Sequence, residues 1–148
     1  MMTPGMYSSK TDEWATPQDL FDELDREFKF NVDVCATEEN AKCKIYFNKE
    51  NDGLKISWNL SSTIMDARCW MNPPYGRKIG AWIQKAYEES LNGVLVVGLL
   101  PARTDTKWFH RWIYNKAEIR FIEGRLYFND GDGCAPFPSM VIIWKAKL

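Results

Sequence analysis

Apolar residues recur along the chain at two spacings, which predict an alternation of helices and strands. Over residues 20–28 and again over 79–91 they fall three or four positions apart, as on one face of a helix. Thr16 and Pro17 precede the first run and are expected to supply its N-cap and its first helical position. A third helix is expected over residues 105–115.

Short runs of β-branched and aromatic residues are the strand candidates. Residues 30–35 alternate polar and apolar side chains, and residues 94–100 form a continuous apolar run of the kind found in buried parallel strands. The other candidates span residues 44–48, 68–71, 118–122, 125–129 and 140–144. Because strands and helices alternate before adjacent strands end the chain, we predict an α/β fold: one Rossmann-like domain over residues 14–148, mostly parallel, with an antiparallel C-terminal end. The polar residues 1–13 are expected to form a flexible N-terminal arm.

The composition narrows the class of protein. Hydrophobic residues make up 45% and charged residues 26%, and no apolar run reaches the roughly 20 residues that cross a bilayer. We therefore expect a soluble, cytoplasmic protein with no membrane partner. The 4 cysteines lie far apart and there is 1 histidine, so neither a metal site nor a disulfide framework is expected. The net charge of −1 implies that any contact with nucleic acid is local.

The candidate for chemistry is Asn72-Pro73-Pro74-Tyr75, which follows the apolar residues 69–71. Each proline holds the residue before it extended, so the Asn72 side-chain oxygen and the Pro73 carbonyl can point into one space beside the Tyr75 ring. Two such acceptors suit an amino group on an aromatic ring. They would hold its hydrogens and leave the nitrogen lone pair available to attack a methyl donor. A surface turn is the alternative interpretation, since Asn-Pro and Pro-Pro are common in turns.

Seven segments stand in the order found in a known family: Trp14-Ala15-Thr16-Pro17, Asp33-Val34-Cys35-Ala36, Asn51-Asp52-Gly53-Leu54 with Trp58, Asn72-Pro73-Pro74-Tyr75-Gly76, Leu100-Pro101-Ala102-Arg103-Thr104-Asp105-Thr106 with Trp108-Phe109-His110, Gly124-Arg125-Leu126 with Phe128, and Pro136-Phe137-Pro138-Ser139. On these segments the chain resembles the phage-type DNA N-6-adenine methyltransferases through most of its length. The resemblance implies a class I methyltransferase fold, S-adenosylmethionine as cofactor, and methylation of adenine N6 in duplex DNA on a flipped-out base. It also implies a bacteriophage origin and the host cytoplasm as location. The same segment serves RNA adenine or protein glutamine in other methyltransferases, and a non-catalytic DNA-binding phage protein is an alternative of another class.

The resemblance also implies roles for particular residues. Asn72, Pro73, Pro74 and Tyr75 would be catalytic, with the Tyr75 ring stacked on the extruded adenine. The methionine end of the cofactor would be wrapped by Trp14, Thr16 and Pro17. The loop after the first strand would contribute Asp33, Cys35 and Ala36, and Asp52 would contact the cofactor's adenine amine. The simpler interpretation is that Thr16 caps a helix, Asp33 satisfies local backbone and Asp52 belongs to a turn.

Two further expectations concern loops. The loop after the first strand lacks the glycines usual in methyltransferases, so the cofactor is expected to lie differently there. Phosphate contacts are expected from Arg77, Lys78, Arg103 and Lys107, for which ordinary solvated charge is an equal alternative. Target specificity is expected from the loop over residues 59–67 and the C-terminal strands. The sequence indicates neither the recognition sequence nor the oligomeric state.

Overall fold

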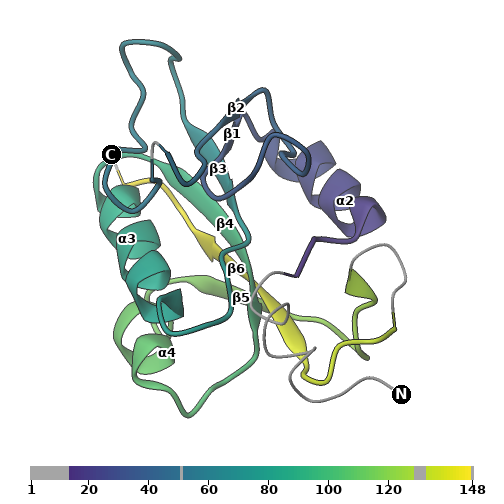
Figure 1. Ribbon diagram of the computed structural model, residues 1–148. Helices are drawn as coiled ribbons and strands as arrows, with labels where there is room; N and C mark the ends of the chain where they lie inside the picture. The colour runs from purple at the N-terminus through teal and green to yellow at the C-terminus, as the bar shows by residue number, and fades with distance from the viewer. Residues whose placement is uncertain (1–13, 51, 129–132, 148) are drawn as a thin grey trace.

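The computed structural model describes residues 14–50, 52–128 and 133–147, and a sheet crosses its centre (Figure 1). The strand order in this sheet is β2-β1-β3-β4-β6-β5. The strands are β1 (Val32–Asp33), β2 (Ile45–Tyr46), β3 (Arg68–Met71), β4 (Leu95–Pro101), β5 (Glu118–Phe121) and β6 (Ser139–Trp144). The predicted α/β class is therefore confirmed.

The order and directions of the strands define a switch point inside the sheet. Strands β2, β1, β3 and β4 are mutually parallel, whereas β6 runs antiparallel to both β4 and β5. The mostly parallel sheet with an antiparallel C-terminal end is thus confirmed. From β1 the sheet extends to β2 on one side and to β3 on the other, which makes the β1–β3 boundary a topological switch point. Ligands of open α/β sheets bind outside the carboxyl ends of the strands at such a point.

Helices cover both faces of the sheet. The helices α3 (Ile79–Leu91) and α4 (Lys107–Trp112) lie on one face, and α2 (Gln18–Phe28) lies on the other (Figure 1). Helix α2 buries Phe21, whose ring meets the edge of Trp70 of β3 at 5.4 Å. It is also tied to β5, because both terminal nitrogens of Arg120 lie 2.7 Å from the two Glu27 carboxylate oxygens.

Several of the large aromatic side chains belong to the core. Trp58, Trp70 and Trp144 are almost fully buried. The indole N–H of Trp58 donates to the Gly53 carbonyl, and that of Trp144 to the Trp112 carbonyl, both at 2.8 Å, so burial leaves neither donor unpaired. Within the described residues, no helix has the length and apolar character needed to cross a membrane.

The structure corrects several expected boundaries. Pro17, not Thr16, occupies the N-cap position of α2, and no side chain caps this helix. Thr16 fails as a cap because its hydroxyl is occupied by a distant partner, the Asn72 amide. The strand expected over residues 125–129 is wrong for residues 125–128, because the chain leaves β5 and turns through Gly124 at a φ of 77°. The expected strands over 30–35 and 44–48 and the helix over 105–115 are real but shorter.

Candidate active site

A cavity of about 530 Å³ opens at the carboxyl ends of β1 and β3. This volume falls within the range of small-molecule sites in proteins. Its lining comes from the segment before α2, the loops on either side of β2, the end of β3 and the start of α3. The lining includes most of the residues that the resemblance singled out: Trp14, Thr16, Asp33, Cys35, Ala36, Asp52, Asn72, Pro73 and Pro74. It also includes Lys78, one of the expected phosphate contacts.

The Asn72 side chain has one satisfied end and one open end. Its amide nitrogen donates to the Trp14 carbonyl at 2.5 Å and lies 2.9 Å from the Thr16 hydroxyl oxygen. Its oxygen, Oδ1, is buried and has no hydrogen-bond partner among the residues that the structure describes. Leaving a buried acceptor unpaired costs roughly 1–3 kcal/mol. The site therefore holds an acceptor ready for a donor from a ligand.

Asp33 ends β1 with a buried carboxylate. One carboxylate oxygen accepts from the Cys35 backbone N–H at 3.2 Å, and the other accepts from the Lys42 backbone N–H at 3.0 Å. Burial raises the pKa of Asp33 to about 6, although these two N–H groups and the Lys42 charge oppose the rise. At neutral pH the carboxylate is therefore ionised. Asp33 satisfies local backbone, as the simpler interpretation held, and it also faces the cavity.

A tight turn at Asp52 and Gly53 presses against the end of β1. A side-chain carbon on Gly53 would lie 2.2 Å from the Val34 carbonyl oxygen, so only glycine fits there. Asp52 has a positive φ of 36°, and its carboxylate accepts from the Leu54 N–H at 3.0 Å. The turn thereby forms part of the cavity wall, with the Asp52 side chain partly exposed.

Sequence reasoning missed part of the lining. The apolar wall contains Phe47, Leu54, Trp70 and Trp82, and the polar rim contains Thr37, Asn40 and Lys42. The apolar residues carry no signal that separates a cavity wall from the core, since Trp82 lies on the same periodic face of α3 as the buried Ile83 and Ala86. For Asn40 and Lys42 the sequence offered no signal beyond their place in or beside the glycine-free loop after the first strand.

Tyr75 lies behind the cavity and does not line it. Its ring is 5% exposed, and its hydroxyl donates to the Leu99 carbonyl at 2.8 Å. The ring meets those of Phe137 and Phe128 edge-on, at 5.6 and 6.3 Å between centroids. Burial raises the pKa of Tyr75 well above its usual value, which keeps the phenol neutral. Stacking of this ring on a base stays a prediction.

The cations expected to meet phosphate lie on loops and helix starts near the site. Lys78 reaches the cavity, and Arg77 beside it is exposed. The first turns of α3 and α4 are neighbours, because a side-chain carbon at Gly80 would lie 3.7 Å from the Trp108 ring, and Lys107 opens α4. The Arg103 guanidinium lies 5.9 Å from the Phe137 ring centre.

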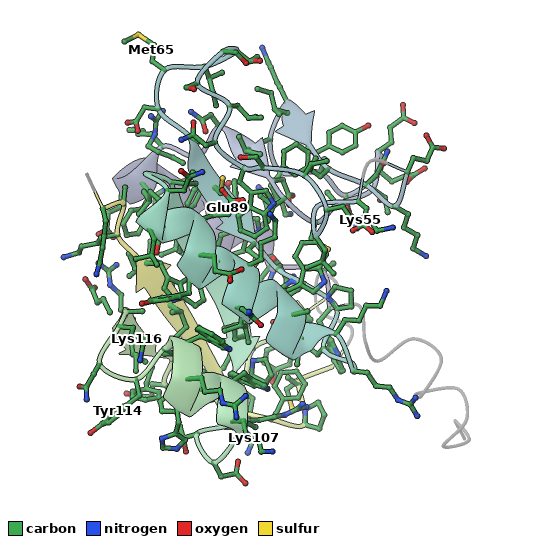
Figure 2. All side chains as sticks on the ribbon, turned by 90° about the vertical axis from the view of Figure 1, so that its left-hand side faces the viewer. Lys55, Met65, Glu89, Lys107, Tyr114 and Lys116 are labelled. Carbon is green, nitrogen blue, oxygen red and sulfur yellow. The ribbon has the colours of Figure 1, made fainter. Side chains whose placement is uncertain are left out.

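The loop over residues 59–67 is poorly placed for target recognition. It precedes β3, so it lies at the amino ends of the parallel strands, opposite the cavity. Figure 2 shows Met65 of this loop and Lys107 at opposite ends of the molecule. This position does not support the expectation that the loop sets target specificity, which stays untested. Pro17 is likewise outside the cavity lining.

A mostly parallel sheet, a cavity at its switch point and an Asn-Pro-Pro-Tyr segment at the end of the neighbouring strand are the features of a class I methyltransferase domain. Comparison with known proteins agrees. The family described as DNA N-6-adenine-methyltransferase (Dam) matches residues 5–146, and the chain belongs to this family.

Individual relatives support this assignment. The DNA N-6-adenine-methyltransferase of Escherichia phage T1 is 34% identical over 116 residues, which cover 78% of this chain and 46% of the relative. The DNA N-6-adenine-methyltransferase of Haemophilus phage HP1 is also 34% identical over 116 residues, covering 77% of this chain and 64% of the relative. A putative methyltransferase, YfdM, of Escherichia coli K12 is 31% identical over 65 residues, 43% of this chain and 71% of the relative. The chain thus spans between about half and two thirds of the first two relatives.

Proposed function

We propose that this chain transfers a methyl group from S-adenosylmethionine to the N6 amine of adenine in DNA. The observation that carries the proposal is the buried Asn72 Oδ1, an acceptor without a donor at the end of β3. An exocyclic amine supplies the missing donor. Both phage relatives are named for this reaction, which supports the choice of adenine N6 and of DNA.

The cavity fits the proposed cofactor. S-adenosylmethionine carries an ammonium and a sulfonium, and Asp33 offers an ionised carboxylate at neutral pH. The adenine ring of the cofactor suits the apolar wall of Phe47, Leu54 and Trp82. When bound, the cofactor supplies an electrophilic methyl group.

The residues at the end of β3 would prepare the amine. Asn72 Oδ1 would accept one N6 hydrogen and thereby favour a pyramidal nitrogen whose lone pair is no longer spread into the ring. The prolines after it fix the backbone, so the acceptor needs no reorganisation during the reaction. The neutral amine would attack, so no general base need deprotonate it beforehand. As the N–C bond forms, the C–S bond of the donor would break with its electron pair going to sulfur, S-adenosylhomocysteine would leave, and the N6 proton would pass to solvent.

The target adenine would have to leave the duplex to reach this acceptor, because the N6 group of a stacked, paired base cannot enter a protein cavity. Arg77, Lys78, Arg103 and Lys107 are the proposed phosphate contacts that hold the backbone on either side. With a net charge of −1, such a local group of cations is what the protein offers to DNA.

The decisive experiment is incubation of the purified chain with unmethylated duplex DNA and methyl-labelled S-adenosylmethionine, followed by nucleoside analysis. The expected product is N6-methyldeoxyadenosine, absent with Asn72→Ala. RNA and a glutamine-containing protein are tested in parallel. Label in either of these but not in DNA would replace the proposed substrate, and cofactor binding without transfer to any of them would contradict the proposed activity.

A further inference from the structure

We infer that the segment Trp14-Ala15-Thr16 sets which way round the Asn72 amide lies, and that Thr16 is a positioning residue for methyl transfer. The inference rests on the proposed function, and it assigns the Thr16 hydroxyl a purpose other than helix capping or cofactor contact. The observation that carries it is the contact between the Asn72 amide nitrogen and the Thr16 hydroxyl oxygen, two residues 56 apart in the chain.

An asparagine amide has an accepting end and a donating end. A half-turn about its terminal bond exchanges oxygen and nitrogen with little change in shape. In one orientation Asn72 presents an acceptor to the target amine, and in the other it presents a second NH₂ group that cannot accept. An amide that sampled both orientations would present no acceptor to the target amine for part of the time. It would then have to turn round before the reaction.

Two contacts hold the amide, and one of them removes this ambiguity. The Trp14 carbonyl can only accept, so the nitrogen of Asn72 must be the atom that faces it. The Thr16 oxygen lies 2.9 Å from the same nitrogen, and Thr16 is 4% exposed, so water does not compete for the contact. Reversing the amide would bring oxygen against oxygen at Trp14 and forfeit that bond, whereas the Thr16 hydroxyl could turn and donate to the oxygen. The Trp14 carbonyl therefore decides the orientation, and the Thr16 hydroxyl holds the amide in place. Oδ1 is thereby left as the only end that a ligand can meet.

The acceptors are themselves held in place. The Trp14 ring packs edge-on against Phe128 at 5.4 Å and against Phe137 at 5.1 Å, on the segment between β5 and β6. On the other side, the Pro17 carbonyl accepts from the Phe21 N–H at the start of α2. The segment is therefore anchored at both ends, and its carbonyl and hydroxyl stand as fixed points for the amide.

The test compares three variants with wild type in methyl transfer and in cofactor binding. Thr16→Val keeps the shape of the side chain but removes the acceptor, Thr16→Ser restores it, and Thr63→Val makes the same change in the exposed loop at the opposite edge. Loss of one hydrogen bond to the reacting side chain should lower kcat roughly fivefold to tenfold in Thr16→Val. The Kd for S-adenosylmethionine should stay at the wild-type value, Thr16→Ser should recover most of kcat, and Thr63→Val should match wild type.

A nuclear magnetic resonance measurement reads the amide directly. In protein labelled with ¹⁵N-asparagine, the Asn72 side-chain pair is the signal missing from Asn72→Ala. Both of its protons should be protected from exchange in wild type, and one should lose protection in Thr16→Val. This spectrum requires no activity. Rapid exchange of the Asn72 protons in wild type would therefore count against the inference even if Thr16→Val does not fold.

Each result separates the inference from the proposed function. A raised Kd with unchanged kcat in Thr16→Val would show that Thr16 binds the cofactor, and wild-type values in both would show that it positions nothing; either result overturns the inference. Rapidly exchanging Asn72 protons in wild type would overturn it as well. Wild-type protein that methylates no DNA would instead count against the proposed function, while protected protons would still support the fixed amide.

Discussion

Replacing Asn72 by alanine should remove the proposed catalytic contact while leaving the fold in place. The substitution removes the open acceptor Oδ1 and, with it, the contact proposed for the target amine. Removing one such preorganised group should raise the barrier by at least about 3 kcal/mol, a rate loss of roughly a hundredfold or more.

The expected effect of this substitution on stability is small, for a reason visible in the structure. The two bonds donated to Trp14 and Thr16 contribute about 0.5–1.5 kcal/mol each, and both are lost. The unpaired Oδ1, which costs roughly 1–3 kcal/mol while buried, is lost with them. Because the two effects have opposite signs, the free energy of unfolding should change by less than about 2 kcal/mol.

The assay is single-turnover methyl transfer to an unmethylated duplex, with calorimetry for the cofactor and urea unfolding for stability. A cofactor Kd within about threefold of wild type is expected, a change of under 1 kcal/mol. The matched control is Asn59→Ala, which removes another amide that donates to a backbone carbonyl, that of Asn92, at the far edge of the sheet. If Asn72→Ala keeps at least about a tenth of the wild-type rate, the proposed role of Oδ1 is refuted.

Further predictions concern the cavity and its surroundings. Asp33→Ala and Asp52→Ala should each weaken S-adenosylmethionine binding, and calorimetry that finds unchanged affinity in both would place the cofactor elsewhere. Since burial raises the pKa of Asp33 from 3.8 to about 6, its ionised form costs stability above pH 6, and this cost disappears as the pH falls through 6 towards 3.8. Relative to Asp33→Asn, wild type should therefore gain at most roughly 3 kcal/mol of unfolding free energy between pH 7 and pH 4 in urea titrations, and a flat difference would contradict the raised pKa. Gly53→Ala should destabilise the fold by about 3 kcal/mol or more in the same titrations, because its new carbon would collide with the Val34 carbonyl. Tyr75→Phe should keep most activity while Tyr75→Ala loses much of it, and 2-aminopurine at the target position should brighten on binding wild type but less on binding Tyr75→Ala. Quenched 2-aminopurine in the bound duplex, together with methylation of the same duplex carrying adenine at that position, would count against base flipping.

The parts of the fold that follow a local pattern could be predicted from the sequence. The helical period of residues 79–91 and the apolar run of 94–100 correspond to α3 and β4, because burial on one face or on both dictates those patterns. The false strand over residues 125–128 had a similar composition, but no neighbouring strand pairs with it. Strand pairing depends on residues distant in sequence, and so composition alone could not exclude it.

In the candidate site, too, the residues restricted by their local sequence could be predicted, and those that depend on distant partners could not. Asn72 could be singled out because the prolines after it restrict the backbone locally. The role of Thr16 could not be identified, because a threonine before Pro17 and a polar first turn is an ordinary capping pattern, and its actual partner lies 56 residues away. The buried position of Tyr75 is equally non-local, since it depends on Leu99 and on the rings of Phe128 and Phe137.

The residues that line the cavity all fall between Trp14 and Trp82, whereas β4, β5, β6 and the segment between the last two come later in the chain. That later segment nevertheless reaches the site from behind, where Phe128 and Phe137 pack on Trp14 and Tyr75. The chain is thus modular in sequence although it is continuous in space. Any exchange of the segment between β5 and β6 would therefore have to keep Phe128 and Phe137, because Trp14, a residue of the cavity lining, packs on both rings.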